Sequence, residues 1–140
     1  MAIFGLDVGE RRVGVAKVDP ETRVVSPVGV FEVENTAGLV EALKDSEDTL
    51  VVVGMPTNQQ GELTQQSEKV KQFALQLKGW LPGTTKINFF GESGTTLLAI
   101  DRLRERGFDD VQLREARASG LVDVEAACII LEGWTEENLS

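Results

Sequence analysis

The sequence predicts an α/β fold built on a mixed five-stranded sheet with helices on both faces. Two short runs, a mostly apolar one at residues 2–8 and a fully apolar one at 50–54, have the character of buried strands. Apolar residues at positions 70, 73, 74 and 77 recur with helical spacing and predict a helix over about 65–78. The chain has 140 residues, of which 41% are hydrophobic, and this fits one domain spanning residues 1–140.

The first third of the chain predicts three strands joined by short turns. Residues 2–8 form the first strand, a turn follows at 9–12, and the second strand runs from residue 13 toward Asp19-Pro20. A third strand follows at about 24–33, so these strands make an antiparallel meander. Pro27 lies within the third strand and predicts an edge or irregular position, because proline has no N–H for a ladder hydrogen bond.

The remaining residues alternate between the two periodicities. The predicted elements are a helix capped at Asn35-Thr36, a strand at 50–54, a helix at 65–78, a strand at 87–90, a helix at 95–106 and a last helix from about residue 122. The polar stretch 109–121 is expected to be a loop. The two later strands are expected to run parallel to the first.

The composition excludes several kinds of chemistry. The chain has no histidine and one cysteine, Cys128, so it has no intramolecular disulfide, no Cys/His zinc site and no histidine-based catalytic triad. Acid–base or metal chemistry must therefore use carboxylates, which favour hard cations such as Mg²⁺ or Mn²⁺. A net charge of −9 argues against a broad nucleic-acid surface but leaves room for a local cationic patch.

No signal peptide and no apolar run of about 20 residues is apparent in the sequence. We therefore expect a soluble, cytoplasmic protein without a membrane segment.

Three carboxylates come at the ends of predicted elements. Asp7 interrupts the apolar first strand, Glu92 follows the fifth strand, and Asp123 opens the last helix. Ligand sites of α/β sheets gather at the carboxyl ends of parallel strands, so the three can converge. A pair of divalent ions about 4 Å apart would neutralise them and serve phosphoryl chemistry. The alternatives are a solvated turn for Asp7 and Glu92, and a helix N-cap for Asp123.

Four segments resemble, in order, the motifs of the YqgF/RuvX family. They are GLDVGERRVGVA at 5–16, VGMPTNQQG at 53–61, ESGTT at 92–96 and VDVEAACIIL at 122–131. The resemblance covers nearly the whole chain.

This resemblance implies an RNase H-like fold, related to the Holliday-junction resolvases, and hydrolysis of phosphodiester bonds by metal-activated water. Family members are regarded as nucleases that mature the 5′ end of pre-16S rRNA. By resemblance, Asp7, Glu92 and Asp123 are the catalytic and metal-binding residues, with Mg²⁺ or Mn²⁺. The implied partners are structured RNA, such as pre-16S rRNA or a ribosomal particle, or branched DNA. We expect a monomer or weak homodimer.

The third motif departs from the family pattern. Gly91 replaces an Asp, Ser93 and Gly94 replace Arg and Leu, and Glu10 replaces a Lys in the first motif. The loss of positive charge bears on substrate affinity more than on the metal site.

Several polar residues near these motifs are candidates for substrate contacts. They are Arg11, Arg12, Asn58, Thr95, Arg114 and Arg117. The alternatives are a solvated hairpin tip for the first two, a polar turn for Asn58 and a helix cap for Thr95.

Three classes of function compete. The first is a metal-dependent nuclease, acting on ribosomal precursor RNA or, as a resolvase, on DNA junctions. Actin-like sugar kinases also open with a strand, Asp-x-Gly and a turn, but 140 residues do not hold their second half. The third class is a non-catalytic nucleic-acid-binding protein, which would not need three converging carboxylates.

Overall fold

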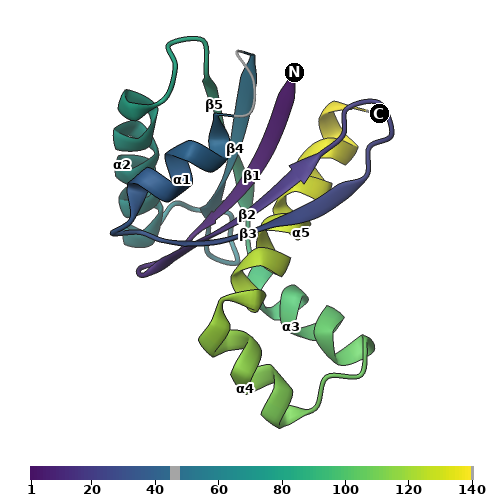
Figure 1. Cartoon of the computed structure of the whole chain (residues 1–140). Coiled ribbons are helices and arrows are strands. Elements are labelled where there is room, and N and C mark those ends of the chain that lie inside the picture. Colours follow the sequence, from purple (N-terminus) through teal and green to yellow (C-terminus); the bar gives the residue numbers. More distant parts are fainter. Residues whose placement is uncertain (45–47, 140) are drawn as a thin grey trace.

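The computed structural model describes residues 1–44 and 48–139, and its strands form one sheet in the order β3-β2-β1-β4-β5 (Figure 1). The elements are β1 (Ala2–Val8), β2 (Arg12–Val18), β3 (Val25–Glu32), α1 (Thr36–Leu43), β4 (Thr49–Pro56), α2 (Gln65–Trp80), β5 (Lys86–Glu92), α3 (Thr95–Glu105), α4 (Asp110–Ser119) and α5 (Leu121–Asn138). No helix in this part of the chain is long and apolar enough to cross a membrane.

The predicted mixed sheet is confirmed. Strands β1, β2 and β3 pair in antiparallel fashion, whereas β4 pairs with β1 and β5 pairs with β4 in parallel. Strand β3 is an edge strand, and its register shifts where Ala16 pairs with Pro27. The irregular edge position predicted from Pro27 is therefore confirmed, because a bulge on an edge strand tolerates the missing N–H.

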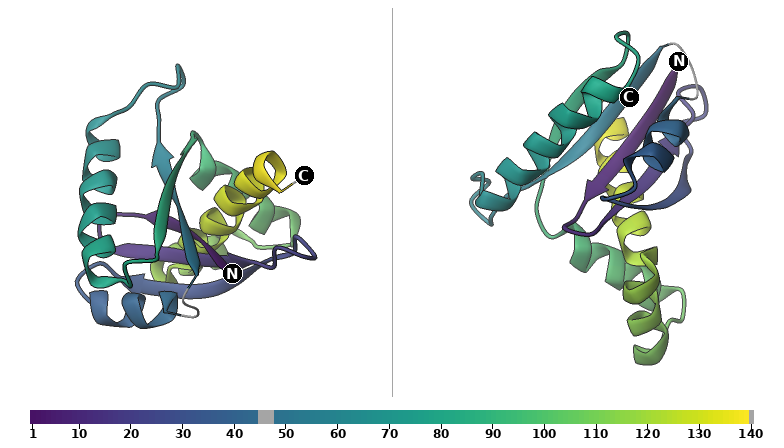
Figure 2. Two further views of the ribbon diagram at one scale, coloured as in Figure 1. Left: turned by 90° about the horizontal axis from the view of Figure 1, so that it is seen from above. Right: turned by 60° about the vertical axis from the view of Figure 1, so that its left-hand side comes forward.

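Helices cover both faces of the sheet, as predicted (Figure 2). Helices α1 and α2 pack on one face, where Phe4 and Leu6 of β1 lie in the same apolar cluster as Leu39 and Leu77. Helix α5 packs on the other face, where Ile3 of β1 clusters with buried residues that include Cys128, Leu131 and Trp134. Because both faces are covered, β1 is an almost continuous buried run.

Three glycines let α5 lie directly against the strands. A Cβ atom on Gly14 of β2 would lie 2.1 Å from the backbone oxygen of Asp123, and one on Gly5 of β1 would lie 3.2 Å from that of Ala127. On Gly54 of β4 it would lie 2.4 Å from the side chain of Ile130. Side chains at these positions would therefore push α5 away from the sheet.

Helices α3 and α4, with the first turns of α5, form an arm below the sheet in Figure 1. The arm has its own apolar cluster, in which Leu103 of α3, Leu113 of α4 and Ile129 of α5 are buried. The predicted loop over 109–121 is wrong, because α4 occupies most of it. Asp109 and Gln112 cap this helix reciprocally, so the capping-box pattern was present in the sequence.

Ion pairs join α3 to α5 within the arm. Arg106 donates two hydrogen bonds to the carboxylate of Glu125, at 2.8 and 3.2 Å. The side chain of Glu125 is only 9% exposed, so this pairing offsets the cost of burying its charge. Arg102 pairs with Glu132, about two turns further along α5. These contacts fix the rotation of the helix that carries Asp123.

Replacing Gly14 by alanine is expected to destabilise the protein by about 3 kcal/mol, because the new methyl group meets the backbone of α5 rather than a movable side chain. Urea unfolding measures the change. Gly79→Ala is the matched control: Gly79 lies within α2 with open space around its Cβ position, so alanine is expected to be neutral or stabilising by up to about 1 kcal/mol. Equal effects of the two substitutions would contradict the role of Gly14.

Candidate active site

Asp7 lies near the carboxyl end of β1 and faces α5. Residues 3, 5 and 7 of a strand share one face, and Ile3 and Gly5 both contact the α5 side. Gly14 pairs with Asp7 on β2, and Gly54 is the next residue after the Leu6–Val53 pair on β4. Two glycines thus flank Asp7, and the space that their missing side chains leave is filled by Asp123 and Ile130 of α5.

Asp123 is the third residue of α5, and its backbone lies over Gly14, the strand partner of Asp7. The N-cap of α5 is Gly120, so the capping alternative for Asp123 is wrong. Burial, together with the negative charge of Asp123, raises the pKa of Asp7 from 3.8 to about 7. Burial also raises the pKa of Asp123, against the opposing effect of Arg12.

Glu92 is the last residue of β5 and lines the same cavity as Asp7, with a volume of about 180 Å³. Burial raises the pKa of Glu92, and the second contribution comes from Glu137 near the end of α5. Sequence reasoning missed Glu137 as a neighbour of this site. No motif marks it, because only the path of α5 across the sheet brings the two carboxylates together.

Asp7 and Asp123 are neighbours, and Glu92 lies across the 180 Å³ cavity from Asp7. Among residues 1–44 and 48–139, no three Asp, Glu, Cys or His side chains come close enough together to make a preformed metal site. The donor set nevertheless fits a hard divalent cation, because it offers only carboxylate oxygens. Burial disfavours the charged form of Asp7, and a bound cation would favour that form.

A second cavity, of about 250 Å³, adjoins the first. It lies between the β1–β2 turn, the start of α3 and the α4–α5 junction. Its lining residues are Gly9, Glu10, Arg11, Arg12, Thr96, Arg117, Val122 and Asp123. Thr96 also lines the Asp7–Glu92 cavity, so the two cavities meet at this residue.

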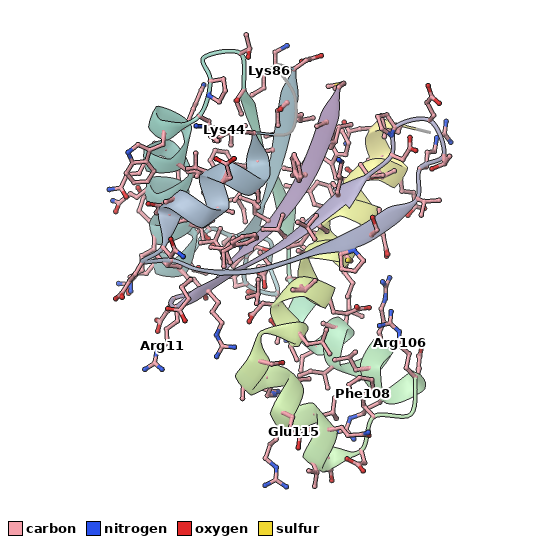
Figure 3. The ribbon with its side chains drawn as sticks, viewed as in Figure 1. Arg11, Lys44, Lys86, Arg106, Phe108 and Glu115 are labelled. Carbon is pink, nitrogen blue, oxygen red and sulfur yellow. The ribbon has the colours of Figure 1, made fainter. Side chains whose placement is uncertain are left out.

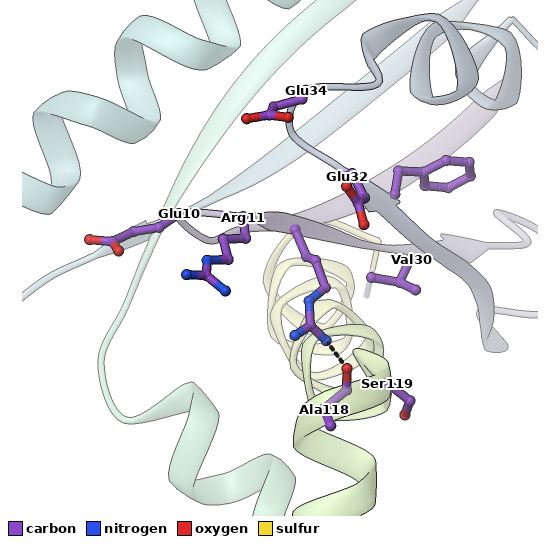
Figure 4. Close-up of a pocket in the computed structure, with 9 residues that line it drawn as sticks. Glu10, Arg11, Val30, Glu32, Glu34, Ala118 and Ser119 are labelled. Carbon is purple, nitrogen blue, oxygen red and sulfur yellow. Dashed lines mark hydrogen bonds between the residues drawn. The ribbon is translucent and has the colours of Figure 1, made fainter.

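Arg12 has a structural task that the sequence did not reveal. Its guanidinium donates hydrogen bonds to the backbone oxygens of Arg117, at 3.0 Å, and Ala118, at 2.8 Å. Figure 4 shows the bond to Ala118. These oxygens lie in the last turn of α4, where carbonyl groups lack helical partners and a cation is favourable. Arg12 therefore ties the β1–β2 turn to α4, beside a further cavity of about 570 Å³.

The other arginines predicted to contact substrate are exposed. Arg11 projects from the β1–β2 turn away from the sheet (Figure 3) and lines the 250 Å³ cavity together with Arg117. Arg114 is exposed on α4 but does not line that cavity.

The two remaining candidates for substrate contacts, Asn58 and Thr95, lie in different surroundings. Asn58 accepts hydrogen bonds from the backbone N–H groups of Gln60 and Glu62, which confirms the polar-turn alternative. Thr95 lines the Asp7–Glu92 cavity, while the N-cap of α3 is Gly94, so Thr95 does not cap the helix.

The fold matches solved nucleic-acid enzymes at low sequence identity. Fowlpox virus resolvase, solved with Holliday junction DNA, superposes with a TM-score of 0.56 at 12% identity over 100% of both chains. RuvC of T. thermophilus, solved with a Holliday junction substrate, gives a TM-score of 0.54 at 16% identity over 98% of this chain and 96% of the other. The chain therefore has the RNase H-like fold of the resolvases.

The sequence comparisons identify the family more narrowly. A family model described as "RuvX: Holliday junction resolvase" matches residues 1–137. A relative from Chlorobaculum tepidum, named "Putative pre-16S rRNA nuclease", is 32% identical, covering 97% of this chain and 94% of its own. A relative of the same name from Anaeromyxobacter dehalogenans is 35% identical and covers 97% of each chain. The chain belongs to the RuvX family.

Replacing Asp7 by asparagine is expected to stabilise the metal-free protein above pH 7. The folded-state pKa of Asp7 lies above its ordinary value, so the wild type loses stability as pH rises from about 4 to about 7 and then levels off. Asparagine carries no charge, so the variant gains at most about 4 kcal/mol above pH 7 and nothing below pH 4.

Urea unfolding in EDTA at several pH values measures this difference. Asp101→Asn, which removes an exposed carboxylate of α3, is the control and is expected to show no such pH dependence. A constant difference between wild type and Asp7→Asn across this range would contradict the raised pKa.

Proposed function

We propose that the protein is a metal-dependent nuclease that hydrolyses phosphodiester bonds, with the whole chain acting as one domain. The observation that carries the proposal is the pairing of Asp7 with Asp123 at the carboxyl end of β1. The names and folds of its relatives support the same class of reaction.

The carboxylate pair is costly unless a cation binds it. Asp7 is mostly buried, and its charged form is disfavoured both by burial and by Asp123. Leucine or asparagine at this position would lower the free energy of unfolding less than the buried charge does. Binding of Mg²⁺ or Mn²⁺ by the two neighbouring carboxylates would offset this cost.

Asp7 and Asp123 would hold the cation from adjacent sides, with Glu92 contributing from across the cavity. Bound divalent cations in such sites activate water and stabilise the charge that develops on the leaving oxygen. Thr95 and Thr96 border the space in which the scissile phosphate would lie, and can donate hydrogen bonds to its oxygens.

The substrate that we propose is pre-16S rRNA, because the relatives are named "Putative pre-16S rRNA nuclease". We further propose that the protein acts on the 5′ end, as the resemblance to the family implies, and in the cytoplasm. A resolvase acting on branched DNA is the second candidate. The description of the family model and the DNA complexes of the structural neighbours favour it. A resolvase cuts two strands symmetrically and needs a two-fold dimer.

Cleavage of a labelled panel tests the proposal. The panel contains single-stranded RNA, a pre-16S 5′-end fragment, duplex DNA and a four-way DNA junction, each with Mg²⁺ or Mn²⁺. We expect cutting of the pre-16S fragment, and a loss of about a thousandfold in Asp7→Asn and Asp123→Asn, since each removes a ligand of the catalytic cation. Glu137→Gln is the control for charge near Glu92 and is expected to retain activity within about threefold.

A second readout separates lost chemistry from lost folding. Mg²⁺ or Mn²⁺ is expected to raise the melting temperature of the wild type but not of Asp7→Asn. Symmetrical cutting of the junction alone would select the resolvase. Folded wild-type protein that binds the cation but cuts nothing would select the non-catalytic binding role.

A further inference from the structure

The arginine-lined cavity beside the carboxylates suggests how the substrate backbone is held. We propose that this 250 Å³ cavity binds one backbone phosphate that flanks the scissile one, through Arg11 and Arg117. This inference rests on the proposed function, since it takes the Asp7–Glu92 cavity as the place of the scissile phosphate.

The charge distribution of the chain supports the proposal. The chain carries a net charge of −9, but residues 95–119 contain five arginines and five carboxylates and are neutral. Three arginines line the cavity, against the carboxylates of Glu10 and Asp123. Phosphate groups would be repelled by much of the surface and attracted here.

Two of the three arginines are available to a ligand. The side chains of Arg11 and Arg117 are exposed and make no ion pair or hydrogen bond with any other residue in the described ranges 1–44 and 48–139. They come from the β1–β2 turn and from α4, so a group between them would be held from two sides. Guanidinium groups are well suited to phosphate oxygens, with their several donors in one plane.

Arg12 holds this cavity in shape rather than binding the phosphate. Its hydrogen bonds to the backbone of Arg117 and Ala118 fix α4 against the turn that carries Arg11. The spacing between the two free arginines therefore depends on Arg12.

The position of the arginine-lined cavity indicates the path of the nucleic-acid backbone. Thr96 lines both the arginine cavity and the cavity of Asp7 and Glu92, and Asp123 lies in the wall of the arginine cavity. A nucleic-acid strand that passes Thr96 can place neighbouring phosphates in the two cavities. The arginines would then set the register of the strand without reading its bases.

Binding of a labelled pre-16S 5′-end RNA fragment to the full-length protein in EDTA tests the proposal by fluorescence anisotropy, without any need for cleavage. Arg11→Ala and Arg117→Ala are each expected to weaken binding about tenfold and to lower the salt slope by about 0.7 to 1. The double variant should lose less than the product of the two effects, because both arginines hold one phosphate. Arg23→Ala removes the same charge at the exposed β2–β3 turn and is expected to have little effect.

Neutral methylphosphonate links, introduced one at a time, locate the phosphate. A neutral link at one position near the cut site should weaken RNA binding by the wild type about tenfold. The same link should not weaken binding by Arg11→Ala or Arg117→Ala any further, because these variants already lack the contact. Under cleavage conditions, the same variants should raise KM with kcat changed less than about threefold.

Losses as large in Arg23→Ala, or losses spread evenly over all link positions, would overturn the proposal and indicate general electrostatic attraction. If cleavage is never observed but the position-specific loss is, the subsite stands and the nuclease assignment fails. If cleavage is observed and neither arginine affects it or binding, the subsite alone fails.

Discussion

The close contact between α5 and the sheet is the constraint on which the site depends. Gly14 has no side chain to separate β2 from the backbone of Asp123, and Gly5 and Gly54 continue the contact over β1 and β4. Asp123 comes near Asp7 only because α5 packs so closely against β1 and β2. The same contact buries the apolar cluster between α5 and the sheet. The packing of the core and the geometry of the carboxylates therefore cannot change separately.

This arrangement sets charge repulsion against packing. Apolar burial holds α5 in place, while two carboxylates of like charge are held close together at its first turn. Polar contacts also hold the start of α5 in place. Arg106 and Arg102 form ion pairs with α5, and Arg12 donates hydrogen bonds to α4, which precedes it. A divalent cation bound between the two carboxylates would offset this repulsion.

Local patterns predicted most of the sheet and placed Asp7, Glu92 and Asp123 at the ends of elements, but they did not predict the contacts between distant elements. Asp7 could be identified because an ionisable group among apolar strand residues is unusual by itself. Helix α4 was missed because only Leu113 and Ala116 face its core, which leaves little apolar periodicity to detect. The structural role of Arg12 needs a helix end that lies 105 residues away in sequence. The approach of Glu137 to Glu92 depends likewise on the path of α5.

The buried thiol between α5 and the sheet has a practical consequence. Cys128 is the chain's one cysteine, and burial, with the nearby charges of Glu125 and Glu132, raises its pKa to about 11. Thiolate formation is therefore suppressed in the native state, and an alkylating reagent reacts only when α5 separates from the strands. The rate of labelling then reports the opening of the element that carries Asp123, with no probe added to the sequence.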